Sequence, residues 1–253
     1  MAYTDLLNLL TVDCKDDGEK FTTTDRIQVI QSLLKDSSYQ LVYEGNASFV
    51  YAKLDFFSQS DQVLVSSHID CVYETCFVAD VDAEHWRGTF DNSATNAAII
   101  DLMLADRLNP SVAVAFAGDE EVDSRGAREV MHYFHSKDIR IRRALVLDVS
   151  NEGFHDEAVC SVENDRGFDI LTGYHLIQAL QTSGLPCVFL HDAEPDETWE
   201  YGKGIPDLYP SIPCLSLCLP VDGDLHAEEG TILRKASIDG YMKILADLAN
   251  SSI

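Results

Sequence analysis

The feature that most constrains this chain is the alternation of short apolar runs with longer segments of helical spacing. The runs VAVAFA at 112–117 and ALVLDV at 144–149 have the length and the β-branched content of buried strands. Just before the first of these runs, the segment SATNAAIIDLMLADRL at 93–108 repeats apolar residues at helical intervals over a wide face, as a helix lying on a sheet does. Buried strands interleaved with helices favour a largely parallel sheet that is covered on both faces.

The other predicted elements continue this alternation along the chain. Strands are predicted at 39–44, 48–54, 62–67, 112–117, 144–149, 158–162, 187–190 and 214–219. Helices are predicted at 3–12, 24–35, 93–108, 124–136, 168–183 and 231–250. Together they predict an α/β fold, a three-layer α/β/α sandwich with a mixed, largely parallel central sheet and an antiparallel edge at 39–54. Because no repeat or long Pro/Gly/Ser linker interrupts the pattern, residues 1–253 are expected to form a single domain.

The composition excludes several classes of partner. The chain has 18 basic against 43 acidic residues and a formal net charge of −25, so its surface should repel phosphate backbones, and no nucleic-acid partner is expected. No apolar run reaches the roughly 18 residues that span a bilayer, and the first ten residues lack the basic region of a signal peptide. We therefore expect a cytoplasmic protein with no membrane partner. The seven cysteines form no C-x-x-C pair, which favours reduced and mostly buried thiols, although Cys71 and Cys76 flank a short loop.

Polar residues gather where the predicted strands end and the helices begin. In open α/β sheets, ligands bind beyond the carboxyl ends of the strands. Seven residues at such positions could carry chemistry: His68, Asp70, Asp91, Glu120, Glu121, Asp148 and His226. Each motif by itself is typical of an ordinary hydrogen-bonded pair, a helix cap or a solvated acidic loop. Their common position instead favours one site of imidazole and carboxylate ligands, which suit Zn²⁺, Mn²⁺ or Co²⁺.

The order of these residues resembles the co-catalytic dizinc aminopeptidase, carboxypeptidase and deacylase superfamily. The resemblance runs over almost the whole chain, and the matching segments read SSHIDCV (66–72), GTFDNSATNAAII (88–100), GDEEVDSRGA (118–127), VLDVS (146–150) and LHAEEGTI (225–232). The resemblance implies one role for each residue. His68 and Asp148 would hold one metal, Glu121 and His226 would hold the other, Asp91 would bridge both, Asp70 would orient His68, and Glu120 would be the general base.

Elementary chemistry agrees with this division of roles. Two divalent cations about 3.5–4 Å apart repel each other, so a bridging carboxylate such as Asp91 is needed to hold them. Neighbouring side chains on an extended or turning backbone point in different directions, so Glu121 could bind a metal while Glu120 moves protons.

The intervals between His68 and Asp91 and between Asp148 and His226 are too short for the separate lid or dimerisation domain of some relatives. The chain therefore resembles the compact branch, in which aminopeptidases predominate.

The expected function is a metal-dependent exopeptidase that removes the N-terminal residue of peptides. The expected cofactors are two divalent ions, zinc first, with cobalt or manganese as alternatives. The expected partners are a peptide or aminoacyl substrate and further copies of the chain in a homo-oligomer. A carboxypeptidase or an N-acyl-amino-acid amidohydrolase would share the same site. A non-catalytic metal-binding protein of this fold would show a lost ligand or a lost base, and here every such position is filled.

Two segments leave questions for the structure. Relatives usually carry Gly two positions after the Glu pair, where this chain has Asp123, so the turn that directs Glu120 could differ. The polar, turn-rich segment 192–213 contains Trp199, Tyr201 and Tyr209. These aromatic residues could recognise the substrate or polarise its carbonyl, and they could equally be surface aromatics packed onto the core.

Overall fold

The computed structural model describes residues 1–14, 24–163, 170–190, 197–203 and 212–251. Its helices are α1 (Tyr3–Leu10), α2 (Asp25–Leu34), α3 (Ser93–Leu104), α4 (Arg125–Ser136), α5 (Ile170–Ser183), α6 (Glu197–Lys203) and α7 (Ser237–Asn250), with a 3₁₀ turn at Phe56–Ser58. Its strands are β1 (Gln40–Glu44), β2 (Ser48–Ala52), β3 (Gln62–His68), β4 (Val78–Asp80), β5 (His85–Gly88), β6 (Val112–Ala117), β7 (Ile141–Ser150), β8 (Cys160–Glu163), β9 (Cys187–Leu190), β10 (Cys214–Asp222) and β11 (Thr231–Arg234).

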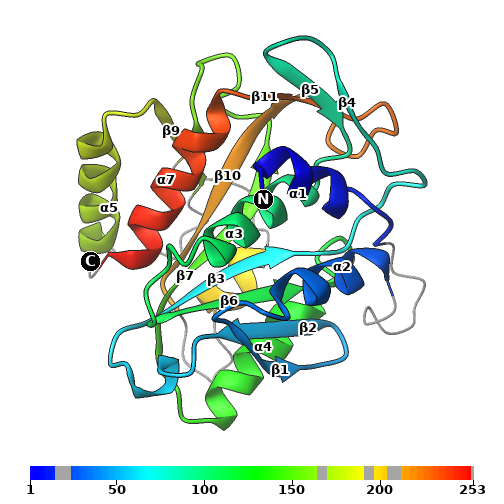
Figure 1. The fold of residues 1–253 in the computed structure, drawn as a ribbon. Coiled ribbons are helices and arrows are strands. Elements are labelled where there is room, and N and C mark those ends of the chain that lie inside the picture. Colours follow the sequence, from blue (N-terminus) through cyan, green and yellow to red (C-terminus); the bar gives the residue numbers. More distant parts are fainter. Residues whose placement is uncertain (15–23, 164–169, 191–196, 204–211, 252–253) are drawn as a thin grey trace.

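The strands of the described residues form one sheet in the order β1-β2-β6-β3-β7-β10-β11-β5-β4, with β8 and β9 branching from β10 (Figure 1). Its centre is parallel, because β6, β3, β7 and β10 all run in the same direction. The strands β1 and β2 add the predicted antiparallel edge. The predicted α/β fold with a mixed central sheet is confirmed.

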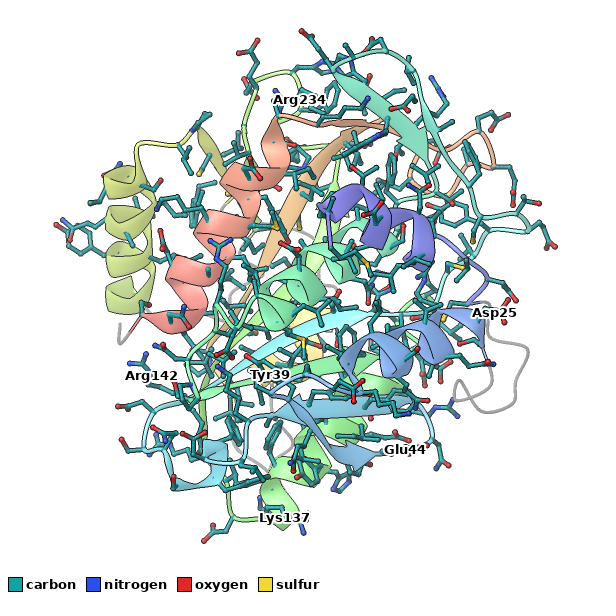
Figure 2. All side chains as sticks on the ribbon, viewed as in Figure 1. Asp25, Tyr39, Glu44, Lys137, Arg142 and Arg234 are labelled. Carbon is teal, nitrogen blue, oxygen red and sulfur yellow. The ribbon has the colours of Figure 1, made fainter. Side chains whose placement is uncertain are left out.

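Alternate residues of the central strands pack against two different helical layers. On β3, Val63 and Val65 belong to the cluster formed with α1, α2, α3 and α7, whereas Leu64 belongs to the cluster formed with α4 and Tyr201 of α6. Figure 1 shows α1, α2, α3 and α7 in front of the sheet and α4 behind it. Since each central strand is covered on both faces, its middle is apolar, as in VLV of β3, VAVAFA of β6 and ALVL of β7. Charged side chains such as Asp25, Glu44 and Lys137 point outward (Figure 2).

The prediction of one helix over 231–250 is wrong at its beginning. Residues Thr231–Arg234 form β11, which pairs with β10 and with β5, and α7 begins only at Ser237. The hairpin of β4 and β5 and the short helix α6 were also not predicted. These elements are short and partly exposed, so they lack the apolar periodicity that reveals longer ones. In the described part of the chain, no helix has the length and apolar character needed to cross a membrane.

Candidate metal centre

The parallel strands deliver the predicted site residues to one edge of the sheet. His68 is the last residue of β3, and in register it lies opposite Ala117, the last residue of β6. The pair Glu120 and Glu121 follows β6 directly, and Asp148 lies near the end of β7 on the other side of β3. All of them therefore lie beyond the carboxyl ends of neighbouring strands, where ligands of such sheets bind.

The start of α3 is tied to this edge by two buried amides. Asn92 donates a hydrogen bond of 2.7 Å from its side chain to the carbonyl of Leu147 in β7. Asn96, one turn along α3, donates another of 2.7 Å to the carbonyl of His68. Asp91, which directly precedes Asn92, is thereby held over the end of β3 although it comes from a separate part of the chain.

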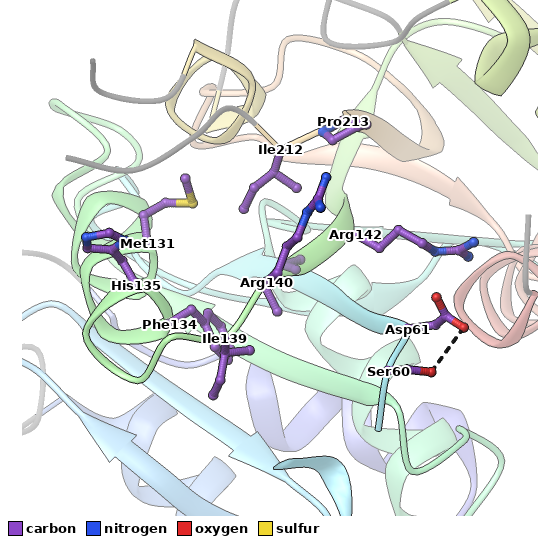
Figure 3. A pocket seen from close by; sticks show the side chains of 11 residues that line it. Ser60, Asp61, Met131, Phe134, His135, Ile139, Arg140, Arg142, Ile212 and Pro213 are labelled. Carbon is purple, nitrogen blue, oxygen red and sulfur yellow. Dashed lines mark hydrogen bonds between the residues drawn. The ribbon is translucent and has the colours of Figure 1, made fainter. Parts of the chain in front are cut away.

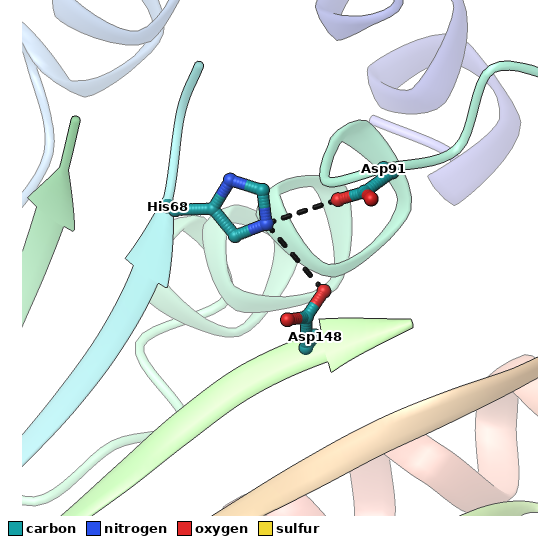
Figure 4. Close-up of side chains that lie close together, drawn as sticks. All are labelled: His68, Asp91 and Asp148. Atoms are coloured by element: carbon teal, nitrogen blue, oxygen red, sulfur yellow. Dashed lines mark ion pairs between the residues drawn. The ribbon is translucent and has the colours of Figure 1, made fainter. Parts of the chain in front are cut away.

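The first group of candidate ligands is His68, Asp91 and Asp148 (Figure 4). His68 Nε2 lies 2.9 Å from Asp91 Oδ1 and 3.4 Å from Asp148 Oδ1. The three side chains point toward a common centre from β3, from the start of α3 and from β7. His68 and Asp91 are both buried.

The second group is Asp91, Glu121 and His226. His226 lies in the connection between β10 and β11, and its Nε2 is 3.5 Å from Asp91 Oδ2 and 3.4 Å from Glu121 Oε2. Asp91 is thus common to both groups, with one carboxylate oxygen facing each imidazole. A third group, His68, Glu120 and Glu121, lies between these two, and within each of the three groups the possible ligand atoms lie within 4.8 Å of one another.

The charges at this site are unbalanced in a way that a cation would relieve. Burial opposes the charged form of His68, but the carboxylates of Asp148 and Asp91 raise its pKa well above the usual value. Burial raises the pKa of Glu121 to about 7, and the neighbouring Asp91 carboxylate acts in the same direction. Among the described residues, the buried atoms Asp91 Oδ1 and Glu121 Oε1 have no hydrogen-bond partner of acceptable geometry. Buried anionic oxygens without donors are costly unless a cation binds them, so the donor set fits metal ions.

Asp70 connects the two groups without belonging to either. Its Oδ1 lies 3.5 Å from His68 Nδ1, the ring nitrogen that faces away from Asp91. Its Oδ2 accepts a hydrogen bond of 3.1 Å from the backbone N–H of Glu121. One buried carboxylate therefore contacts an imidazole of the first group and the backbone of a candidate ligand of the second, the position that a partner behind metal ligands would take.

The turn that carries the Glu pair is built around Asp119 rather than around a glycine after the pair. The Asp119 carbonyl accepts hydrogen bonds from the N–H groups of Asp123 at 2.9 Å and Ser124 at 2.5 Å. Its carboxylate pairs with Arg125 Nε at 2.6 Å. Asp123, the residue that departs from the usual pattern, points outward and pairs with Arg128 at 2.8 Å. The turn therefore forms with Asp123 at the surface, and having Asp123 in place of glycine does not move Glu120 and Glu121 away from the site.

Of the three aromatic candidates, Tyr201 is buried in a network and is not available to a substrate. It is 0% exposed, and its hydroxyl lies 2.9 Å from Ser66 Oγ and donates to Glu197 Oε1 at 3.2 Å. Ser66 Oγ also donates to the same Glu197 oxygen at 2.8 Å. Trp199 is 47% exposed, and Tyr209 lies outside the described residues.

The buried Glu197 is a residue that sequence reasoning missed. It accepts a hydrogen bond from Ser66, two residues before His68, and so connects α6 to β3. Burial raises the pKa of Glu120 to about 8, and the negative charges of Asp148 and Glu197 act in the same direction. The segment 192–213 is polar and turn-rich, so its sequence contains no signal that this carboxylate is buried.

A separate cavity of about 660 Å³ lies at the opposite, amino-terminal end of β3 and β7 (Figure 3). Its wall includes Arg140 and Arg142 together with apolar residues of α4 such as Met131 and Phe134. None of the candidate metal ligands lines it. The acidic edge and this cavity are therefore distinct regions of the molecule.

The chain is thus an α/β protein with adjoining groups of His, Asp and Glu at the carboxyl edge of its sheet. Several solved structures are similar to it in fold over nearly its full length. The TET aminopeptidase of a marine-sediment archaeon of the Thaumarchaeota is 10% identical with a TM-score of 0.79, and the match covers 99% of this chain and 96% of that one. The TET1 peptidase of Pyrococcus horikoshii, described as assembling into a tetrahedron or a large octahedral shell, is 11% identical with a TM-score of 0.70 and coverages of 98% and 99%.

A third solved structure, described as an endoglucanase from Thermotoga maritima, is 13% identical with a TM-score of 0.64 and covers 99% of this chain and 97% of that one. No protein-family model matches the sequence, and no curated protein matches it. At these identities the likeness shows the fold, and it confirms at that level the resemblance seen in the sequence.

Proposed function

We propose that the protein is a metal-dependent aminopeptidase that uses two divalent ions. The observation that carries this proposal is the position of Asp91, whose two carboxylate oxygens face the imidazoles of His68 and His226 from the two sides of one site. A single carboxylate shared between two ligand groups is what a pair of divalent cations requires, because their mutual repulsion must be screened.

Each residue has a proposed role. His68 and Asp148 would hold one ion, Glu121 and His226 would hold the other, and Asp91 would bridge them, while Asp70 keeps His68 oriented. When bound, the ions would lower the pKa of a water molecule and polarise the scissile carbonyl. Zinc is the first choice, because two imidazoles with carboxylates form a borderline donor set, and cobalt or manganese would suit it as well.

Glu120 is proposed as the residue that moves protons. Burial raises its pKa to about 8, with the carboxylates of Asp148 and Glu197 adding to the effect. A carboxyl group with a pKa near the working pH can accept a proton from the attacking water and deliver it to the leaving amine. Glu121, its neighbour in sequence, has its backbone held by Asp70 and its side chain directed toward His226.

A free amino terminus is the substrate feature that the site favours. The two similar TET proteins are an aminopeptidase and a peptidase, and a strongly acidic surface attracts the positive charge of an α-amine. Carboxypeptidases and N-acyl-amino-acid amidohydrolases would share the metal ligands but not this preference. A glycosidase of the usual kind works with a pair of carboxylates, whereas this site adds two imidazoles, which favours metal-assisted hydrolysis.

We also propose that the protein forms a homo-oligomer in the cytoplasm. The Pyrococcus TET1 peptidase can assemble into a tetrahedron or a large octahedral shell, and the seven cysteines of this chain form no disulfide in the structure, as is usual in a reducing compartment. Light scattering coupled to size-exclusion chromatography would measure the assembly directly. A monomeric mass across the micromolar range would contradict it.

The function is tested by a substrate screen of metal-reconstituted protein. The screen uses four kinds of substrate: aminoacyl reporters, their N-acetylated counterparts, C-terminal reporters and a soluble cellulose derivative. Each is also incubated with the metal-free protein as the matched control. Hydrolysis of the free-amine reporters alone, dependent on added metal, is the expected result. Preferential cleavage of the N-acetylated or C-terminal reporters would move the assignment to a deacylase or a carboxypeptidase, and cleavage of the cellulose derivative alone would contradict a peptidase.

A further inference from the structure

A pair of thiols lies immediately behind the candidate metal centre, outside the machinery assigned to the reaction. Cys71 follows Asp70 in sequence, and its Sγ lies 3.9 Å from Sγ of Cys76. Cys71 is buried and Cys76 is partly exposed. A disulfide needs an S–S distance of about 2.05 Å, so the two sulfurs must approach by roughly 2 Å, within the reach of side-chain rotation and a small loop movement.

The surroundings of Cys71 stabilise a thiolate. The guanidinium of Arg26 is fully buried beside it and, within the described residues, donates its hydrogen bonds to the carbonyls of Leu10, Ile69 and Val12 rather than to a carboxylate. A buried guanidinium that bonds only neutral acceptors favours an anion nearby. The thiols of Cys14, Cys71 and Cys76 all lie near this guanidinium, and burial raises the pKa of Cys14, which leaves the Cys71 sulfur as the thiol best placed to supply the anion.

Hydrogen bonds to the Cys71 sulfur act in the same direction. A hydrogen bond from the Cys76 thiol lowers the pKa of Cys71 to about 6, against the opposing effect of burial. The charge of Arg26 and hydrogen bonds from the backbone N–H groups of Cys14 and Tyr73 contribute to this lowering. The same arrangement raises the pKa of Cys76. The pair therefore combines one nucleophilic thiolate with one protonated neighbour that can resolve it, as redox-sensitive cysteine pairs do.

The loop between the two cysteines is attached to the metal-ligand loops. The Tyr73 hydroxyl donates a hydrogen bond to the carbonyl of Leu225, the residue before His226. The backbone N–H of Glu74 donates to the Glu228 carboxylate at 2.7 Å, two residues after His226. At its other end, the loop begins at Asp70, the residue that orients His68. A change in the geometry of 71–76 is thus transmitted to both ligand groups.

We propose that Cys71 and Cys76 form a peroxide-reactive modification site whose disulfide loosens the metal centre. The Cys71 thiolate attacks one oxygen of a hydroperoxide, the O–O bond breaks, and the departing hydroxide is protonated to water. Cys71 is then a sulfenic acid. The Cys76 sulfur attacks it, the S–O bond breaks, and the hydroxyl leaves with the Cys76 proton as a second water. Two thiols are oxidised by two electrons, and one hydrogen peroxide is reduced to two waters.

The site is tested on the metal-loaded full chain with hydrogen peroxide as the probe. After brief treatment, the remaining thiols are alkylated under denaturing conditions and the peptides are identified by mass spectrometry. The expected product is a 71–76 disulfide, two hydrogen atoms lighter and reversed by dithiothreitol, with the other five cysteines alkylated. Alkylation of both Cys71 and Cys76 after treatment would overturn the proposal.

Two variants distinguish the roles of the two thiols. In Cys76→Ser, the sulfenic acid on Cys71 should persist and be trapped by dimedone. In Cys71→Ser, oxidation of Cys76 should be about tenfold slower, because its thiol stays protonated. Cys187→Ser, in the other neighbouring thiol pair formed with Cys160 across β8 and β9, is the matched control and should react like the unmodified chain. Equal rates in Cys71→Ser and in the control would overturn the assignment of Cys71 as the reactive thiol.

The coupling to the metal centre has a readout that needs no enzymatic activity. Release of metal to a chromophoric chelator should be several-fold faster from the oxidised than from the reduced protein, and dithiothreitol should restore the slower rate. Cys76→Ser, which cannot form the disulfide, should release metal at the rate of the reduced protein after the same peroxide treatment. A disulfide that forms without changing the release rate would overturn the coupling. Because thiol mapping and metal release are measured without substrate, a failed peptidase assignment would leave both results interpretable.

Discussion

The two ends of the central strands use buried charges in opposite ways. At the amino-terminal end, Arg143 of β7 is buried, and its guanidinium donates to the Ser251 carbonyl at 2.9 Å, to its hydroxyl at 2.8 Å and to the carbonyl of Leu248. At the carboxyl end, the buried Asp91 Oδ1 and Glu121 Oε1 have no hydrogen-bond partner of acceptable geometry among the described residues, although His68 Nε2 lies 2.9 Å from Asp91 Oδ1. One end ties the end of α7 to the sheet, whereas the other gathers four carboxylates around two imidazoles.

This difference shows where stability and chemistry are separated in the molecule. A buried charge that donates several hydrogen bonds contributes to the folded state, because removing it leaves its acceptors unpaired. A cluster of unsatisfied ligands lowers stability until a cation binds, and such strain is found at functional sites. Substitutions at the carboxyl end should therefore affect metal and turnover, and substitutions at the amino-terminal end should affect folding.

The largest effect is expected from Asp91→Ala, because it removes the carboxylate shared by both ligand groups. Loss of an outer partner alone typically lowers metal affinity 10–100-fold, so loss of this bridge should lower it by more than about 100-fold for both ions. Elemental analysis after metal loading checks this, with Asp148→Ala as the matched control that should lose one ion of two. If Asp91→Ala retained both ions and full activity, Asp91 would be only a residue at the start of α3.

The next effect separates the two neighbouring glutamates. Glu120→Gln keeps the shape of the side chain but cannot accept a proton, so metal content should persist while kcat falls about 10²–10⁴-fold. Glu121→Gln should instead weaken metal binding, with activity partly restored by added metal. Measuring kcat across a metal titration for both variants distinguishes them. Rescue of Glu120→Gln by metal, with Glu121→Gln inactive throughout, would reverse the two assignments.

A smaller and different effect is expected at the amino-terminal end. Arg143→Ala should lower the free energy of unfolding by about 1–3 kcal/mol, since buried acceptors at the end of α7 lose their donor. Metal content and kcat should not change. Arg140→Ala is the matched control, because Arg140 lines the cavity and makes no hydrogen bond or ion pair to the described residues. Denaturant unfolding measures both variants, and equal stability losses would show that the separation between the two ends is wrong.

The smallest effect is a pH dependence of the metal-free protein. Burial raises the pKa of Glu120 to about 8 and that of Glu121 to about 7, and the hydrogen bond with Asp91 raises that of His226 to about 9. In the unfolded chain, the side-chain pKa is about 4.3 for Glu and about 6.5 for His. At any pH between these unfolded values and the raised folded values, the folded protein therefore binds more protons than the unfolded chain. Stability must then fall as pH rises from about 5 to 9.

The metal-free protein should consequently melt several degrees lower at pH 9 than at pH 6. Stoichiometric zinc should reduce this difference, because a bound cation replaces the protons that the folded site otherwise needs. Calorimetry of the two forms at both pH values is the measurement. A metal-free protein whose melting temperature rose between pH 6 and pH 9 would be incompatible with the charge arrangement at the carboxyl edge.

The fold was predictable wherever a segment carries its own periodicity. The runs at 62–67 and 112–117 became β3 and β6, and their buried character follows from the apolar residues Val63–Val65 of the first and from the continuously apolar second. The beginning of the last predicted helix was wrong because Thr231 and Ile232 pair with Gly88 and Arg87 of β5. That pairing depends on a hairpin that is distant in sequence, and local periodicity contains no information about it.

The sequence by itself determined which residues lie at the ends of strands, because the periodicity that defines a strand also defines where it stops. It thereby placed His68, Asp148 and the Glu pair on one edge of the sheet. Only the tertiary structure decided that Asp91 turns one oxygen toward each imidazole, that Tyr201 is enclosed with Ser66 and Glu197, and that two thiols approach to 3.9 Å behind the site. The physical reason is that side-chain direction along a strand follows from local geometry, whereas distances between separate segments are set by packing, register and loop closure.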